Sequence, residues 1–251
     1  VAFTGGTDTA KSINRTRAAK PGAIVPLIAE TGGLNAMFVD TSAQREQVID
    51  DVIISAFGSA GQRCSALRLL FLPEETADLL IEGIAGAMDT LVIGDPRHCS
   101  TDIGPVIDVA AKNTLLRHMA SLRNGGGRVL KECRLSGKSP LLFAPAMVEI
   151  GIDQLPDREV FGPILHVVRY RASDLEKAAK ALAAKGYGLT LGIHSRLEGF
   201  ARKIRSLVKA GNIYINRSMI GAVVGVQPFG GEGLSGTGPK AGGPFAIYLY
   251  A

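Results

Sequence analysis

A cysteine and a glutamate in two separate turns are the residues of this chain with the clearest potential for chemistry. Cys64 follows a glycine-containing turn at the end of an expected helix and precedes an expected strand. A thiolate is a strong nucleophile, so a cysteine at the edge of a cleft could form a covalent intermediate. Glu30 follows an apolar run and precedes Thr-Gly-Gly, and its carboxylate could act as a general base. The pair indicates nucleophilic catalysis; the alternatives are a buried structural thiol and a surface carboxylate.

The other two cysteines have no comparable context. Three cysteines at irregular spacing are too few for a disulfide framework, and they match no Cys-x-x-Cys metal pattern. We therefore expect no metal site and a reducing, cytoplasmic environment. Free cysteine is among the most buried residue types, so Cys99 and Cys133 keep the interpretation of structural thiols.

The hydrophobic pattern around these residues predicts strands that alternate with helices. Runs of strand character cover residues 1–3, 23–29, 36–39, 67–72, 128–133, 141–150, 164–170, 189–194 and 212–216. Helical patterns cover residues 8–20, 41–57, 74–90, 110–123, 174–185 and 198–210, with an N-cap expected at Thr41 or Ser42. This order is typical of an α/β fold with a mostly parallel sheet and flanking helices. A glycine-rich segment begins at Gly225, and it needs packing partners to be ordered.

Composition and charge exclude several classes of protein. The 251 residues are 46% apolar and 20% charged, which is typical of a globular chain of one or two domains. The apolar runs are far shorter than the ~18 residues that span a bilayer, so we expect no transmembrane segment. The formal charge of +5 and the pI near 9.2 raise the question of nucleic-acid binding. Basic and acidic side chains are interspersed, however, so we expect no nucleic-acid partner.

Five short motifs are distributed over the chain. They are Phe-Thr-Gly-Gly-Thr at residues 3–7, Glu-Thr-Gly-Gly at 30–33, Gly-Gln-Arg-Cys at 61–64, Glu-Val-Phe-Gly-Pro at 159–163 and Pro-Phe-Gly-Gly at 228–231. In this order they resemble the aldehyde dehydrogenase superfamily. Residues 211–228 resemble the glutamate-semialdehyde (1-pyrroline-5-carboxylate) dehydrogenases, and residues 232–244 are most similar to the bifunctional proline utilization A flavoproteins. In those flavoproteins a proline dehydrogenase barrel, which holds the FAD, precedes the aldehyde dehydrogenase module.

The resemblance implies catalytic roles for the first two residues. Cys64 would attack the aldehyde carbon of glutamate 5-semialdehyde to give a thiohemiacetal, which becomes a thioester when hydride leaves for NAD. Glu30 would activate the water that hydrolyses this thioester to glutamate, a reaction of proline catabolism. The backbone N–H of Cys64 would stabilise the oxyanion. The family also uses an upstream Asn side chain there, which has no counterpart in this sequence.

The resemblance also implies the binding residues. NAD would contact Thr4, Gly5, Gly6, Thr31, Gly32, Glu159 and Phe161, and the substrate would contact Ser65, Gly221, Ala222 and Phe229. Gly5 and Gly6 match the place where the pyrophosphate meets a helix start. Glu159 matches the carboxylate that holds the nicotinamide ribose, and Phe161 matches the ring near the nicotinamide. The hydroxyl of Ser65 and the main chain of Gly221 and Ala222 would anchor the substrate carboxylate, with Phe229 as an aromatic wall.

The expected domain organisation follows from the same resemblance. Residues 1–32 would be the C-terminal remnant of a Rossmann-like NAD-binding domain, residues 33–233 the catalytic domain with the thiol nucleophile, and residues 234–251 a C-terminal glycine-rich segment. We expect the chain by itself to bind NAD weakly and to turn over slowly, and FAD to have no site in it. Expected partners are further copies of the chain or the remainder of a longer parent, which could be peripheral to the membrane. The alternative function is an inactive interaction or assembly module derived from this fold.

Overall fold

A seven-stranded sheet forms the body of the molecule in the computed structural model, which describes residues 1–135, 139–223, 225–238, 240–244 and 246–250. The strands occur in the order β10-β9-β3-β4-β7-β6-β5. They are β3 (Ala36–Val39), β4 (Leu69–Pro73), β5 (Arg128–Glu132), β6 (Ala146–Glu149), β7 (Ile164–Tyr170), β9 (Thr190–His194) and β10 (Asn212–Ile215). Neighbouring strands are parallel except for the antiparallel pair β5 and β6, which confirms the expected mostly parallel sheet.

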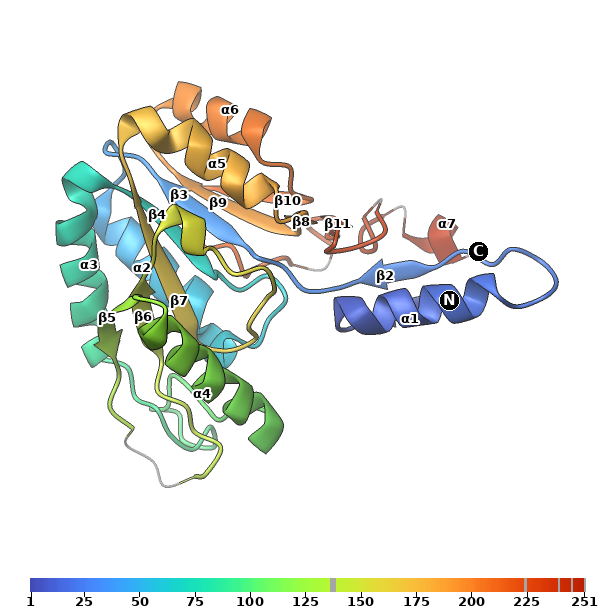
Figure 1. The fold of residues 1–251 in the computed structure, drawn as a ribbon, viewed down its shortest axis with the longest axis horizontal. Coiled ribbons are helices and arrows are strands. Elements are labelled where there is room, and N and C mark those ends of the chain that lie inside the picture. The colour runs from blue at the N-terminus through green and yellow to red at the C-terminus, as the bar shows by residue number, and fades with distance from the viewer. Residues whose placement is uncertain (136–138, 224, 239, 245, 251) are drawn as a thin grey trace.

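Helices cover both faces of this sheet (Figure 1). One face carries α2 (Arg45–Phe57) and α3 (Glu74–Asp89), and the other carries α4 (Val109–Asn124), α5 (Leu175–Ala183) and α6 (Glu198–Leu207). Successive residues of a strand therefore enter different cores. Phe38 stacks on Phe71 at 4.3 Å between ring centroids on the α4, α5 and α6 side, whereas Met37 packs on the α2 and α3 side. Burial on both faces explains why these strands are continuous apolar runs.

A smaller unit, which we call the arm, projects from the body (Figure 1). It consists of β1 (Ala2–Thr4), α1 (Thr7–Ala18) and β2 (Ile28–Glu30), with β1 and β2 paired in parallel. The C-terminal segment joins the arm to the body. Its β11 (Glu232–Gly233) pairs with β8 (Tyr187–Gly188) of the body, and Gly236 forms a bridge with Glu30 at the end of β2. This contact gives the glycine-rich segment the packing partners that its order requires.

The short elements complete the chain. The 3-10 helices are η1 (Gly58–Gly61), η2 (Ile152–Gln154) and η3 (Ala172–Asp174), and α7 (Ile247–Tyr250) is the last helix described. Among the described residues, no helix has both the length and the apolar character needed to cross a membrane.

Two expected strands are wrong over part of their length. Within residues 23–29 the strand begins only at Ile28, and Ile24 is 97% exposed. Pro26 has no N–H for a ladder, so pairing begins after it. Within residues 141–150 the strand begins only at Ala146, directly after Pro145, for the same reason.

The helix expected over residues 41–57 begins later, and its expected cap is wrong. It starts at Arg45 with Gln44 at the N-cap position, and neither Thr41 nor Ser42 caps it. The hydroxyl of Ser42 donates to Asp40 Oδ2 instead and accepts the N–H of Arg196. Ser42 is therefore occupied in a contact with another part of the chain that local sequence could not reveal.

Candidate active site

A cleft of about 1170 Å³ lies between the arm and one edge of the large sheet. Its lining includes every sequence-predicted site residue except Gly221, namely Thr4, Gly5, Gly6, Glu30, Thr31, Gly32, Cys64, Ser65, Glu159, Phe161, Ala222 and Phe229. These residues come from segments spread over more than two hundred positions of sequence. The fold thus brings the separate motifs to one cavity.

The cleft faces the amino-terminal edge of the body's parallel strands. Cys64 precedes β4, Glu159 precedes β7, and Asn35 directly precedes β3. Ligands of open α/β sheets usually bind outside the carboxyl ends of the strands. A search of this sequence at the carboxyl ends of its strands would therefore have examined the wrong edge of the body.

The turn before Cys64 has an unusual backbone. Ser59, Ala60 and Gly61 all have left-handed conformations, with φ of 55°, 54° and 63°. A Cβ atom on Gly61 would lie 2.3 Å from the carbonyl oxygen of Gly162, so a side chain has no room there. Left-handed backbone is unfavourable at Ser59 and Ala60, and such conformations persist where the surrounding structure enforces them. The turn is held in shape by its packing against the segment that precedes β7.

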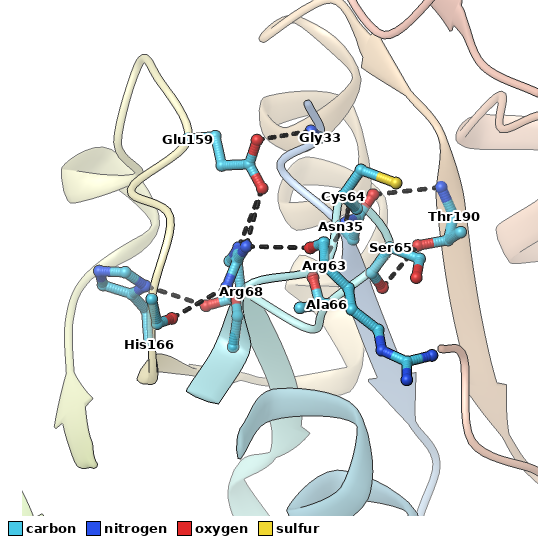
Figure 2. A network of polar contacts seen from close by, with 12 residues as sticks. Gly33, Asn35, Arg63, Cys64, Ser65, Ala66, Arg68, Glu159, His166 and Thr190 are labelled. Atoms are coloured by element: carbon cyan, nitrogen blue, oxygen red, sulfur yellow. Dashed lines mark hydrogen bonds and ion pairs between the residues drawn. The ribbon is translucent and has the colours of Figure 1, made fainter. Parts of the chain in front are cut away.

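Asn35 holds the main chain of residues 59–66, which carry the candidate nucleophile Cys64 and are called the nucleophile turn below (Figure 2). Its Nδ2 donates to the carbonyl oxygens of Cys64 at 2.6 Å and Ala66 at 2.9 Å. Its Oδ1 accepts the N–H of Thr190 at 3.1 Å, and the side chain is buried. Thr190 Oγ1 donates in turn to the carbonyl oxygen of Ser65. The orientation of the Cys64 peptide is therefore determined by β3 and β9 together.

Arg68 joins the nucleophile turn to Glu159 (Figure 2). Its Nε and Nη2 donate to Glu159 Oε1 at 3.2 and 2.9 Å. Its remaining contacts go to main-chain carbonyls: Nη1 donates to Gly61 and Gly162, and Nη2 also donates to Arg63. A guanidinium has five N–H donors, and each has an acceptor here. A buried charge requires such complete pairing.

Burial and mutual attraction act in opposite directions on this ion pair. Burial raises the pKa of Glu159 and lowers the pKa of Arg68, while the attraction between the two charges opposes both shifts. Each charge therefore offsets part of the desolvation of the other. Glu159 Oε2 also accepts the N–H of Gly33, and a Cβ atom on Gly32 would lie within 1.8 Å of that oxygen. The carboxylate therefore rests directly on the Thr-Gly-Gly turn.

The environment of Cys64 opposes the thiolate. Burial raises the pKa of the thiol, and the charges of Glu159 and Glu30 raise it further, while the N–H of Ser65 lowers it. At neutral pH the resting side chain is accordingly a thiol. Its reactivity depends on a base or on a change of charge in the cleft.

Glu30 has the properties of a base that works near neutrality. Its Oε2 accepts the N–H of Gly231 at 2.9 Å, and its buried Oε1 has no hydrogen-bond partner among the described residues. Burial raises the pKa of this carboxyl to about 7, against the opposing influence of the Gly231 N–H and the Lys240 charge. A general base is most effective when its pKa lies near the working pH.

The arm side of the cleft has a helix start that is open to an anion. Gly6 is the N-cap residue of α1, and nothing lies within 4 Å of a Cβ atom placed on it. The helix start can therefore be approached closely by an anion such as a pyrophosphate. Phe161 is 44% exposed toward the same cleft, with the Arg68 guanidinium 5.3 Å from its ring centroid. No group of three metal-ligating side chains occurs within the described part of the chain.

The opposite end of the cleft contains the expected substrate anchors. Arg63 Nη1 donates to the carbonyl oxygen of Ile220, which ties the loop carrying Ala222 to the nucleophile turn. Ser65 is buried at the cleft wall, and Phe229 forms a bridge with Gly242. Gly221 lies beside Arg217 rather than in the lining. Val224 and Pro239, which are part of the motifs at this end, lie outside the described residues.

Sequence reasoning missed the polar residues that hold the site together. The hydrophobic pattern places Arg68 and Thr190 within expected strands and Asn35 just before one, and it gives Lys240 only a place in the glycine-rich segment. A signal was present in two cases, because Arg68 interrupts an apolar run and Asn35 stands directly before one. A polar side chain next to a strand that is buried on both faces requires hydrogen-bond partners.

Three comparisons place the chain among known proteins. The profile of the aldehyde dehydrogenase family matches residues 1–251. The chain is 50% identical over 260 residues to the bifunctional protein PutA of Klebsiella aerogenes, covering 100% of this chain and 20% of the relative. It is 35% identical over 257 residues to the 1-pyrroline-5-carboxylate dehydrogenase of Geobacillus sp. (strain WCH70), covering 100% of this chain and 49% of the relative.

A solved structure of a relative is also similar to this chain over its whole length. A crystal structure of a bifunctional proline utilization A (PutA) protein superimposes with a TM-score of 0.96 at 56% identity, covering 100% of this chain and 25% of that one. The chain thus spans a fifth to a half of the length of these relatives.

Proposed function

The chain belongs to the aldehyde dehydrogenase family, and on that premise we propose that it is the catalytic part of an enzyme that oxidises glutamate 5-semialdehyde to glutamate with NAD. The observation that carries the proposal is the single cleft that gathers Cys64, Glu30 and Glu159. The semialdehyde is the open form of 1-pyrroline-5-carboxylate, the compound for which some relatives are named.

The proposed chemistry begins at Cys64. Its Sγ forms a bond to the aldehyde carbon, the thiol proton passes to a base, and the carbonyl oxygen becomes the oxyanion of a thiohemiacetal. The backbone N–H of Cys64 donates to that oxygen, and Asn35 orients the peptide by holding the Cys64 carbonyl. NAD, when bound, supplies the acceptor for the hydride that the substrate carbon loses.

Hydrolysis of the resulting thioester is assigned to Glu30. Its carboxylate removes a proton from water as the water oxygen attacks the thioester carbon, and the thiolate of Cys64 leaves. Burial keeps the pKa of Glu30 at about 7, so the base form is present at neutral pH and can also release the proton afterwards. The same carboxyl could accept the thiol proton in the first step.

Binding roles are assigned on the same basis. The start of α1 at Gly5 and Gly6 would hold the cofactor pyrophosphate, and Glu159 would hold its ribose hydroxyls after partial release from Arg68. The remaining proposed cofactor contacts are Thr4, Thr31, Gly32 and Phe161, and the proposed substrate contacts are Ser65, Gly221, Ala222 and Phe229. The arm through residue 32 would then belong to a cofactor-binding domain, residues 33–233 to the catalytic domain, and residues 234–251 to a closing segment.

An ester substrate tests the nucleophile without the cofactor. Attack of Cys64 on p-nitrophenyl acetate forms an acyl thioester and releases p-nitrophenol, and hydrolysis of the thioester releases acetate. Cys99 is exposed and would also react with the ester, so the assay is best run in a Cys99→Ser background. We expect a burst of one p-nitrophenol per chain that Cys64→Ala abolishes. A burst that survives Cys64→Ala contradicts the proposed nucleophile.

Cofactor use is tested separately. Isothermal titration of the chain with NAD should give binding weaker than micromolar, because the arm supplies only a small part of the expected cofactor site. NADH formation from the semialdehyde should be slow in this chain and should depend on Cys64. Absence of a burst, together with equal reactivity of Cys64 and Cys133 toward alkylation, would favour the alternative of an inactive assembly module.

A further inference from the structure

The segment that closes over Glu30 carries a lysine that takes no part in the steps above. Lys240 Nζ donates to Asn212 Oδ1 at 3.2 Å. Asn212 is a nearly buried residue at the start of β10. The lysine is therefore tied to the body of the molecule rather than extended into solvent.

Asn212 also holds the turn that contacts Glu30. Its Oδ1 accepts the N–H of Gly230 at 3.2 Å, and its Nδ2 donates to the carbonyl oxygen of Pro228 at 2.8 Å. The next residue, Gly231, donates its N–H to Glu30 Oε2. One amide side chain thus connects the ammonium group of Lys240 to the turn that fixes the carboxylate.

Lys240 and Glu30 lie against the same face of Gly230. A Cβ atom on Gly230 would lie 2.8 Å from Lys240 Cα and 3.0 Å from Glu30 Oε1. A Cβ atom on Gly236 would also lie 3.0 Å from that oxygen. Glycine at these two positions allows the two segments to close tightly around the carboxyl group. The buried Oε1, which has no hydrogen-bond partner among the described residues, is on this side.

Two charged or ionisable groups in the described part of the chain act on Glu30, namely Lys240 and Cys64. The Lys240 charge lowers the pKa of Glu30, against the larger effect of burial, and the Glu30 and Cys64 charges disfavour each other. Burial lowers the pKa of the Lys240 ammonium group, and the negative charges of Glu232 and Glu30 oppose that shift. Among the described residues, Lys240 is therefore a cation that offsets part of the effect of burial on the pKa of Glu30.

We propose that Lys240 is a positioning residue for the general base: held by Asn212, its ammonium group attracts the Glu30 carboxylate and keeps the 228–231 turn closed against it. The inference rests on the proposed function for the role of Glu30 as base, but the electrostatic coupling exists independently of that role. The first test therefore uses no enzymatic reaction.

Carboxyl NMR tests the coupling directly. In the chain labelled with ¹³C at glutamate carboxyl carbons, Glu30→Gln identifies the Glu30 signal, and its titration is followed in wild type, Lys240→Met, Lys240→Gln and Lys240→Arg. We expect the midpoint to move upward by about one pH unit in both neutral variants, because an opposite charge nearby is lost. Lys240→Arg should stay close to wild type. Lys177→Met, which removes an exposed lysine on α5, should leave the midpoint unchanged. An unchanged midpoint in Lys240→Met and Lys240→Gln overturns the proposal.

The ester assay tests the consequence for the base. In Lys240→Met the burst should keep its amplitude, while steady-state hydrolysis at pH 7 should fall about fivefold and its pH profile should shift upward with the NMR midpoint. Lys240→Arg should restore the profile, which a merely structural defect would not. A shifted NMR midpoint with no burst in wild type would contradict the proposed nucleophile and leave the coupling standing. A hydrolysis profile in Lys240→Met that superimposes on that of wild type would contradict the positioning role.

Discussion

The body and the arm hold their charged side chains in opposite ways. In the body, Arg68 and Glu159 form a pair whose side chains are 1% and 11% exposed, with every guanidinium donor paired. Between body and arm, Arg158 and Asp8 form a pair in which both side chains are 77% exposed. Glu159 of the first pair and both members of the second pair line the same cleft. The first can fix geometry, whereas water and salt compete with the second.

Their apolar packing differs in the same direction. The strands of the body are buried on both faces, whereas α1 of the arm buries Ala10 and the loop before β2 leaves Ile24 exposed. Two paired strands alone are marginally stable. The C-terminal segment therefore adds contacts that stabilise the arm, and through the N–H of Gly231 it also holds Glu30, the candidate base at the last residue of β2.

The largest expected effect is on the base. Glu30→Gln should slow hydrolysis of the acyl thioester by about 10²- to 10⁴-fold while the burst remains, because the carboxamide cannot accept a proton from water. In wild type the hydrolysis rate should rise with pH through about 7, as the carboxyl ionises. The measurement is steady-state ester hydrolysis as a function of pH. Glu82→Gln, an exposed change on α3, is the matched control, and equal losses in both variants would argue against a specific role for Glu30.

The next largest effect concerns the two ion pairs, whose loss should change the free energy of unfolding by different amounts. Arg68→Met should lower the free energy of unfolding by about 3 to 5 kcal/mol, because it leaves the Glu159 charge buried without its partner. Arg158→Met should cause no measurable change, since exposed pairs contribute little. Urea unfolding of both variants gives the comparison. Similar losses would mean that the arm contact is as important for stability as the buried pair.

Substitution of one glycine in the body and one in the arm should also affect stability differently. Gly61→Ala should lower the free energy of unfolding by about 2 kcal/mol or more. The backbone at Gly61 is left-handed, and a Cβ atom there would clash with the Gly162 carbonyl oxygen. Gly6→Ala should lower the free energy of unfolding by less, on the order of 0.5 to 1 kcal/mol, because its φ is −72°, the space beside it is open, and only the poorer N-cap preference of Ala acts. Thermal unfolding measures both. A tolerated Gly61→Ala would show that the nucleophile turn can relax.

The last expected effect is the pH dependence of stability. The pKa of Glu30 is raised from 4.5 to about 7 in the fold, so the folded state retains the proton that the unfolded state loses. This stabilisation is fully present below pH 4.5 and is lost as pH rises through 7. Relative to Glu30→Gln, wild type should therefore become less stable between these two pH values. A constant difference between the two proteins across that range would contradict the raised pKa.

Motif order and apolar patterning were enough to predict much of the fold and to single out candidates for the reacting groups. The strands at residues 36–39 and 164–170 were predicted with the observed bounds, because burial on both faces makes such strands uniformly apolar. The predicted cap at Ser42 failed because a contact with Asp40 and Arg196 occupied its hydroxyl. Local propensity is a weak guide wherever a polar side chain finds a partner distant in sequence.

The sequence by itself determined the family, the order of the elements and the identities of Cys64, Glu30 and Glu159 as candidates, because these depend on residue type and local pattern. Only the tertiary structure decided what surrounds them. Arg68 meets Glu159 across 91 positions, and the N–H of Gly231 meets Glu30 across 201. Burial and long-range hydrogen bonds set the charge states of the thiol and the carboxyls, and both depend on which segments pack together. That packing is also why Asn35, Arg68 and Lys240 became visible as parts of the site only in three dimensions.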